Sequence, residues 1–127
     1  NFHPDLVILG FGMNDRCGME EYRNKTGRLM EAIRKVSPKT EFLLIASTLP
    51  NELAATEPHH FWAHQDEYSE SLKGLEGMGV AIADIQAVQK EIGKRKRYID
   101  ITGNWLNHPN DYLARILAQV VIKTLGM

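Results

Sequence analysis

An uncharged amide follows the first apolar segment of the chain, at a place where a catalytic hydrogen-bond donor is useful. The run Leu6-Val7-Ile8-Leu9 is bounded by proline and glycine, which is typical of a buried parallel strand. Ligands in open α/β sheets bind outside the carboxyl ends of such strands. The next segment, Gly12-Met13-Asn14-Asp15, is therefore predicted to form part of a site, with Gly12 and Asp15 shaping a turn. The Asn14 amide is suited to donate to a developing oxyanion.

A second group that can do chemistry lies near the other end of the chain. His108 is followed by Pro109, and by Asn110 and Asp111. Proline suits the start of a helix, and either of the two following residues can cap its first turn. This pattern predicts a rigid turn that presents the imidazole of His108. Imidazole takes and returns a proton near neutral pH, so His108 is a candidate general base.

Each segment also has a purely structural interpretation. Asn14 and Asp15 are both residue types that bond their own backbone and form turns. A helix-initiating turn can contain His108 without using its ring. Short motifs have low specificity, so the functional hypothesis depends on the occurrence of both segments, in this order, in one α/β chain.

Strand and helix patterns alternate along the chain, which predicts a single α/β domain over residues 1–127 with a parallel sheet and helices on both sides. The first helix is expected to turn Tyr22, Leu29, Ile33 and Val36 toward the sheet. The expected strands are Leu6–Leu9, Phe42–Ala46 and Val80–Asp84, and the expected helices are Glu20–Val36, Gln65–Gly77, Ile85–Lys96 and Asn110–Leu125.

Composition excludes several classes of partner. The 127 residues are 43% hydrophobic and 24% charged, with a formal net charge of −1. This balance gives no electrostatic argument for nucleic acid or an anionic membrane surface. No segment approaches the roughly 20 apolar residues of a membrane span. We expect a soluble protein, and the sequence does not distinguish a cytoplasmic from a secreted one.

Together, the two segments resemble those of the SGNH hydrolases, the GDSL-type esterase and lipase family. Gly12-Met13-Asn14-Asp15 is similar to the Gly-x-Asn-Asp block of that family, and His108-Pro109-Asn110 is similar to its final block. The resemblance implies a flavodoxin-like three-layer α/β/α fold. It also implies that Asn14 is an oxyanion-hole donor and His108 the general base, with no cofactor and no metal.

The chain departs from the family pattern in two ways. The Gly-Asp-Ser block that carries the family's nucleophile is absent, and none of Ser37, Ser47, Ser69 and Ser71 lies in such a block. The resemblance thus covers only the carboxyl-terminal portion of a hydrolase domain. The family's aspartate three residues before the histidine is replaced by Trp105. A backbone carbonyl or Asp111 would then orient His108, although capping is the simpler role for Asp111.

Other residues extend the predicted site. Phe61 and Trp62, in a long connection, are expected to form part of a substrate rim together with Trp105 and Asn107, because aromatic rings can stack on sugars. His60 and His64 have the one-face spacing of metal ligands, with His59 beside them. No carboxylate or cysteine completes a metal pattern, so no metal site is predicted.

The resemblance implies a serine esterase that acts on small-molecule carboxylic esters, with carbohydrate O-acyl esters preferred. The alternative is a noncatalytic α/β binding or interaction module that keeps the fold. The first strand would have a bare edge without the strands that flank it in the family. We therefore expect the missing amino-terminal portion, or a homodimer partner, to cover that edge.

Overall fold

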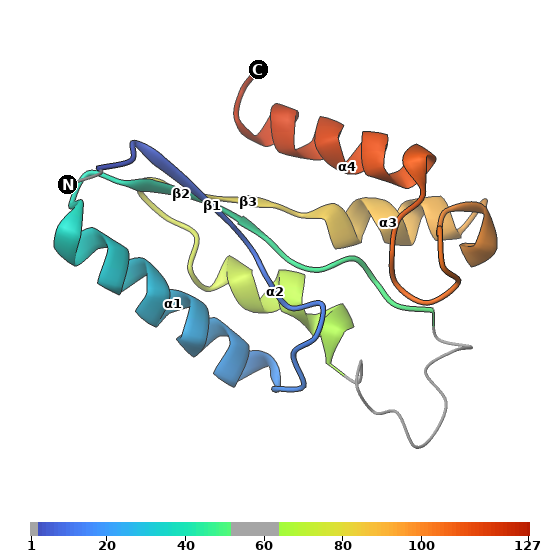
Figure 1. Cartoon of the computed structure of the whole chain (residues 1–127), viewed down its shortest axis with the longest axis horizontal. Coiled ribbons are helices and arrows are strands. Elements are labelled where there is room, and N and C mark those ends of the chain that lie inside the picture. The colour runs from blue at the N-terminus through green and yellow to red at the C-terminus, as the bar shows by residue number, and fades with distance from the viewer. Residues whose placement is uncertain (1–2, 52–63) are drawn as a thin grey trace.

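The computed structural model describes residues 3–51 and 64–127 and contains three strands and four α-helices (Figure 1). In chain order, the elements are β1 (Leu6–Gly10), α1 (Met19–Val36), β2 (Glu41–Ile45), α2 (Tyr68–Lys73), β3 (Val80–Ala83), α3 (Ile85–Gly93) and α4 (Asp111–Thr124). Single 3-10 turns precede α2 (Gln65–Glu67) and follow α3 (Tyr98–Asp100). The predicted alternation of strands and helices is confirmed.

The strands form one parallel sheet in the order β1-β2-β3. Leu9 of β1 pairs with Leu44 of β2, which pairs with Ile82 of β3, so these side chains share one face. Because all three strands run in the same direction, their carboxyl ends meet at one edge. This edge is where a ligand site is expected.

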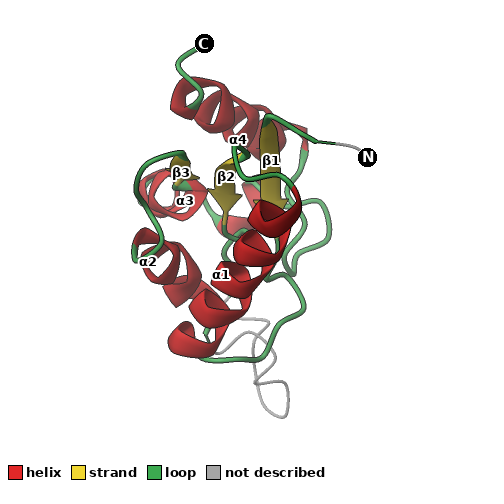
Figure 2. Cartoon of the chain, turned by 90° about the vertical axis from the view of Figure 1, so that its left-hand side faces the viewer, coloured by secondary structure: helices red, strands yellow, loops and turns green. Residues whose placement is uncertain are grey.

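Helices cover both faces of the sheet. α1 and α2 lie on one side, and α4 lies on the other (Figures 1 and 2). The core between the sheet and the first pair of helices includes Leu9, Phe42 and Leu44, with Tyr68 and Leu72 of α2. On the opposite face, Leu113 of α4 is buried. The chain therefore has the predicted α/β fold.

Two details of the helices differ from expectation. Tyr22 is buried and Ile33 packs against the core as predicted, but Leu29 and Val36 are 38% and 61% exposed. Thr26 and Met30 take their place in the buried stripe of α1. A threonine fits this stripe since the Thr26 hydroxyl donates to the Tyr22 carbonyl at 3.0 Å.

The second helix is shorter than predicted, and α2 ends at Lys73. Gly74 follows it directly, and a tight reversal comes a few residues later. Gly77 and Val80 exchange backbone hydrogen bonds in a tight reversal, and Gly79 within that reversal has a φ of +68°, which glycine adopts without strain.

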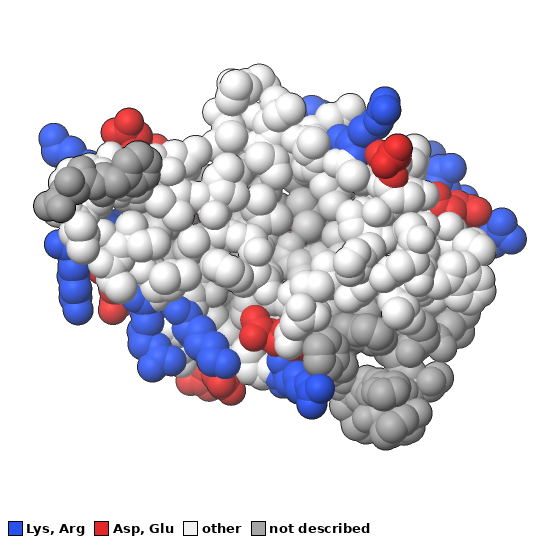
Figure 3. All heavy atoms as spheres, viewed as in Figure 1, with Lys and Arg blue, Asp and Glu red and all other residues white. Residues whose placement is uncertain are grey.

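β1 lies at an edge of the sheet, and among the described residues it pairs only with β2. Leu6 is 40% exposed, Ile8 51% and Phe11 57%. Figure 3 views the molecule from the side of β1, and charged side chains on this face gather at its periphery, leaving the centre uncharged. Within the described residues, β1 therefore presents apolar surface that is left partly exposed. In the described part of the chain, no helix is long and apolar enough to cross a bilayer.

Candidate active site

A β-turn after β1 carries Asn14. The amide of Asp15 donates to the carbonyl of Gly12 at 3.2 Å, which places Met13 and Asn14 at the tip. Gly12 has a φ of +113°, and a Cβ there would lie 2.9 Å from Cδ2 of Tyr68. Only glycine fits this position. The turn leaves Asn14 exposed, so its amide is accessible from solvent.

Two stacked tyrosines support the segment that contains this turn. The rings of Tyr22 and Tyr68 lie 3.9 Å apart at an angle of 9°. The Tyr22 hydroxyl donates to the carbonyl of Phe11 at 3.0 Å, and the Tyr68 hydroxyl donates to that of Cys17 at 2.8 Å. Burial raises the pKa of both phenols, aided by the nearby negative charge of Asp15. Both hydroxyls therefore stay protonated and able to donate.

A buried glutamine forms hydrogen bonds with the backbone of the turn. Nε2 of Gln65 donates to the carbonyls of Gly12 and Met13, at 2.9 and 2.5 Å. Gln86 in turn donates to the backbone carbonyls of Gln65 and Ser47, at 2.6 and 2.8 Å. Gln65 is fully buried, so these amide contacts replace the water that the turn carbonyls would otherwise bind.

A second loop holds His108 by its backbone. The Asn104 side-chain oxygen accepts from the amides of Leu106, Asn107 and His108, each at 3.0 Å. The carbonyl of His108 accepts from the Thr102 hydroxyl and from the Gly103 amide, both at 2.8 Å. The ring of His108 is exposed at the end of this fixed backbone.

The same loop is joined to the segment that follows β2. The Thr48 hydroxyl donates to the carbonyl of Asn107 at 2.8 Å. The backbone and side-chain amides of Asn51 donate to the carbonyls of Leu106 and Trp105, both at 2.8 Å. The loop of His108 and the turn of Asn14 are thus held at the same edge of the sheet.

Tyr98 strengthens this connection. Its hydroxyl lies 2.8 Å from the carbonyl oxygen of Leu49 and 3.0 Å from that of Leu106, as a donor to these groups. Burial raises the Tyr98 pKa to about 12, although a hydrogen bond with Thr102 opposes the shift.

Asn14 and His108 share this edge without touching. Within residues 3–51 and 64–127, no hydrogen bond joins their side chains and no carboxylate pairs with His108. Asn110 caps α4 by accepting from the amide of Leu113 at 3.1 Å, whereas Asp111 is exposed in the first turn. The arrangement presents an amide that can donate and an imidazole that can accept a proton. It does not itself include a nucleophile or a substrate.

The predicted rim is described only in part. Trp105, three residues before His108, is 56% exposed and has a φ of +65°. Asn107 is buried, and its side-chain oxygen accepts from Asn104 at 3.2 Å, so it helps to build the loop. Phe61 and Trp62, with His59 and His60, lie outside the described residues.

The four serines of the sequence, Ser37, Ser47, Ser69 and Ser71, are all buried. The Ser69 hydroxyl donates to Asp84 at 2.7 Å, and that of Ser71 donates to the carbonyl of Met19 at 2.5 Å. Ser47 is at the carboxyl end of β2, yet its hydroxyl is buried and has no partner among the described residues. None of these hydroxyls is exposed beside His108.

No group of three or more metal-binding side chains occurs in the part of the chain that the structure describes. His64 lies 3.4 Å from Glu67, its near neighbour on the same turn.

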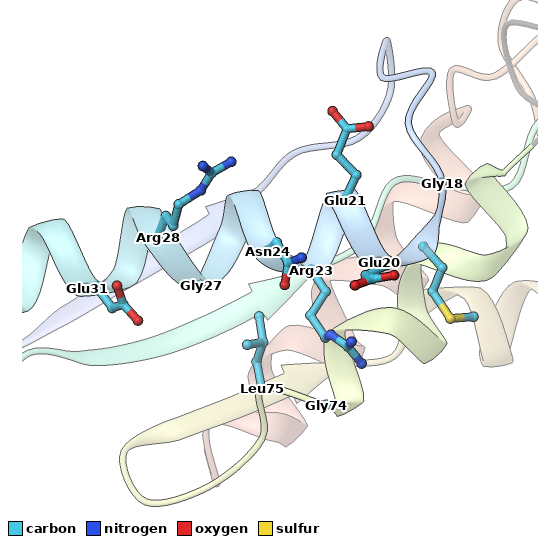
Figure 4. A pocket seen from close by; sticks show the side chains of 11 residues that line it. Gly18, Glu20, Glu21, Arg23, Asn24, Gly27, Arg28, Glu31, Gly74 and Leu75 are labelled. Carbon is cyan, nitrogen blue, oxygen red and sulfur yellow. The ribbon is translucent and has the colours of Figure 1, made fainter.

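A groove of about 890 Å³ runs along α1 and reaches Gly74 and Leu75 beyond the end of α2 (Figure 4). Glu20, Glu21 and Glu31 line it together with Arg23 and Arg28. These mixed charges favour no single ligand chemistry. Neither Asn14 nor His108 lines this groove, so the candidate site is separate from it.

Solved structures with low sequence identity to this chain have the same fold. A protein from Parabacteroides merdae named as a GDSL-like lipase matches with a TM-score of 0.78 and 19% identity, over 97% of this chain and 61% of that one. A catalytic mutant of an acetylxylan esterase from Geobacillus stearothermophilus matches with a TM-score of 0.76 and 19% identity, over 98% and 60%. No family model and no curated protein sequence matches the chain.

The chain thus shares the fold of these lipase and esterase structures, and it spans about 60% of their length. The residues that support the two loops, Gln65 and Asn104, were missed by sequence reasoning. A polar side chain far along the chain carries no signal that it is buried beneath a turn. The asparagines on either side of Trp105, at positions 104 and 107, could have indicated hydrogen bonds from side chain to backbone.

Proposed function

We propose that the chain is the carboxyl-terminal portion of an ester hydrolase domain, in which Asn14 donates to the oxyanion and His108 is the general base. One observation carries this proposal: an exposed amide and an exposed imidazole are held rigidly at the carboxyl edge of a sheet whose fold matches esterase structures. Both side chains stand at the ends of elements where catalytic groups are expected in α/β folds.

The nucleophile would come from a serine outside this sequence. Burial of all four serines of the chain supports this assignment. In the proposed reaction, the external serine attacks the ester carbonyl while His108 accepts its proton. The base then returns the proton to the leaving alcohol, and Asn14 donates to the negatively charged oxygen. Water completes the cycle by hydrolysing the acyl-serine.

The substrate class that we propose is a carbohydrate O-acyl ester. Two matched structures are named for an acetylxylan esterase and an acetyl-xylooligosaccharide esterase. The exposure of Trp105, in the loop that carries His108, supports a sugar-stacking surface.

The same external portion is proposed to cover the edge of β1. The exposed Leu6, Ile8 and Phe11 would then be buried against it. Burying apolar surface contributes about 25 cal/mol per Å², so this contact would stabilise the assembled domain. A second copy of the chain is the alternative occupant.

The test is ester hydrolysis by the natural protein that carries this sequence, assayed on acetylated xylo-oligosaccharides. His108→Ala and Asn14→Ala are expected to lower kcat far more than they change KM, with a loss of about 2.7–4 kcal/mol of transition-state stabilisation for the oxyanion donor. His64→Ala is the matched control, since His64 is an exposed histidine paired with Glu67. Full turnover by the His108→Ala protein would contradict the assignment and favour a noncatalytic binding module. Turnover by the 127-residue chain alone would contradict an external nucleophile.

A further inference from the structure

We infer that Asn104 is the positioning residue of His108, which it holds through the backbone and not through the imidazole. The inference rests on the proposed function, because it assigns the way in which the proposed base is oriented. Asn104 lies four residues before His108, and its hydrogen bond to that residue in the described structure goes to the backbone amide.

The hydrogen bonds fix both peptide groups that flank the Cα of His108. On the amino side, the His108 amide donates to the Asn104 side-chain oxygen at 3.0 Å. On the carboxyl side, the His108 carbonyl accepts from Thr102 and Gly103. With both peptide planes held, the direction of the Cα–Cβ bond is set. Only the two side-chain torsions of the imidazole stay free.

Three amides converge on the one oxygen of Asn104. Those of Leu106, Asn107 and His108 all lie 3.0 Å from it, which requires the chain to curl around the side chain. Trp105 adopts its φ of +65° within this curl. A bulky residue rarely takes that conformation, because its Cβ crowds the backbone. The bonds to Asn104 therefore offset a local strain at the residue that stands where a triad acid would be.

No carboxylate takes over this orienting role among the described residues. Asp111 is exposed at the start of α4, and no ion pair joins His108 to an acid in the described ranges. An acceptor that fixes the backbone is thus the orienting contact that the fold supplies.

The test compares Asn104→Ala with Asn104→Asp. Alanine removes the acceptor, whereas aspartate keeps an oxygen for the three amides, and Asn107 can turn its amide group to donate to it. Leu106→Ala is the control for a general change in the loop, because only the backbone of Leu106 forms hydrogen bonds in the described structure. Hydrogen exchange of the amides of residues 106–108 and the NMR signals of the His108 ring are measured in each variant.

In Asn104→Ala, the three amides are expected to exchange about two- to tenfold faster, since each loses the acceptor that protects it from exchange. The His108 ring signals should shift, because the backbone that sets the direction of the Cα–Cβ bond is no longer held on its amino side. Asn104→Asp and Leu106→Ala should keep the original signals. Unchanged exchange and ring signals in Asn104→Ala would overturn the inference.

Kinetics of the natural protein separate positioning from mere loop stability. Asn104→Ala should lower kcat by about tenfold or more with little change in KM, because a displaced base misaligns proton transfer. Asn104→Asp should restore kcat. Faster amide exchange with an unchanged kcat, or equal losses in both variants, would overturn the inference. If the wild-type protein hydrolyses no ester, the proposed function fails, and the His108 ring signals alone then decide the positioning role.

Discussion

The side-chain nitrogen of Gln65 lies 2.9 Å from the carbonyl oxygen of Gly12, a contact that spans 53 positions of the sequence. It couples the start of the α2 region to the turn that presents Asn14. Because the same nitrogen also donates to the carbonyl of Met13, a single buried amide satisfies both carbonyls. The geometry of the proposed oxyanion donor therefore depends on a residue outside its own loop.

Replacing Gln65 with methionine is expected to destabilise the chain. The substitution keeps an unbranched side chain of similar length but removes the donor to the partly buried Met13 carbonyl and one of the two donors to the Gly12 carbonyl, which keeps the Asp15 amide. The expected cost is about 1–3 kcal/mol. Urea denaturation measures the free energy of unfolding. Asn24→Ala, at an exposed position of α1, is the control and should change stability by less than about 0.5 kcal/mol. A similarly small effect of Gln65→Met would show that water replaces the amide at no cost.

Trp105 offers a test of backbone strain. At a φ of +65°, Trp105→Gly is expected to keep the stability of the chain or raise it by up to about 1 kcal/mol. Trp105→Val should lower it by about 1–2 kcal/mol, because a β-branched residue is strained in this region. Thermal unfolding measures both. If the exposed ring also binds sugar, Trp105→Gly will raise KM for carbohydrate esters, so stability and affinity will change independently.

The chain should lose stability at alkaline pH. Burial raises the pKa of Tyr98 from 10.0 to about 12 in the folded protein, and it also raises the pKa of Tyr22 and Tyr68. The folded state therefore holds these protons more tightly than the unfolded state does. The stabilisation is complete below pH 10 and is lost as the pH rises through about 12.

Unfolding followed by circular dichroism should coincide with the appearance of tyrosinate absorbance over this range. Tyr98→Phe should reduce the dependence on pH, although it also removes the bonds to Leu49 and Leu106. Tyrosinate that forms without unfolding would contradict the predicted linkage.

The edge of β1 predicts self-association of the isolated chain. Ile8 is 51% exposed on an apolar strand with a free edge in the described structure, and such edges pair with other strands. Ile8→Lys should reduce the apparent mass in sedimentation experiments, because a lysine on the strand disfavours pairing. Val36→Lys is the control, since Val36 is 61% exposed at the end of α1. A monomeric wild-type chain would contradict the prediction.

The spacing of apolar residues, with glycines and prolines between the segments, was enough to predict the order of strands and helices. The parallel sheet followed from their alternation. The face of α1 was predicted less well. Leu29 and Val36 share a helical face with Ile33, but Thr26 and Met30 form a neighbouring stripe that packs on the sheet. Apolar spacing alone does not choose between overlapping faces when a threonine can satisfy its hydroxyl on the helix backbone.

The sequence signals for the candidate site lie beside its two exposed side chains. Asn14 comes two residues after Gly12 and His108 directly precedes Pro109, and the backbone preferences of glycine and proline mark turns and helix starts. Their supports do not have such markers. Gln65 and Asn104 act through long-range or side-chain to backbone contacts, and these exist only once the chain has folded.

α4 buries a single residue, Leu113, along its 14 residues. A helix anchored this lightly is expected to open locally at a lower free energy than the sheet, so it belongs to the early-exchanging units of the fold. Opening it would release the cap at Asn110 and with it the carboxyl-terminal stem of the His108 loop. The ordering of the proposed base is then governed by a local fraying equilibrium. The global melting temperature would not report it.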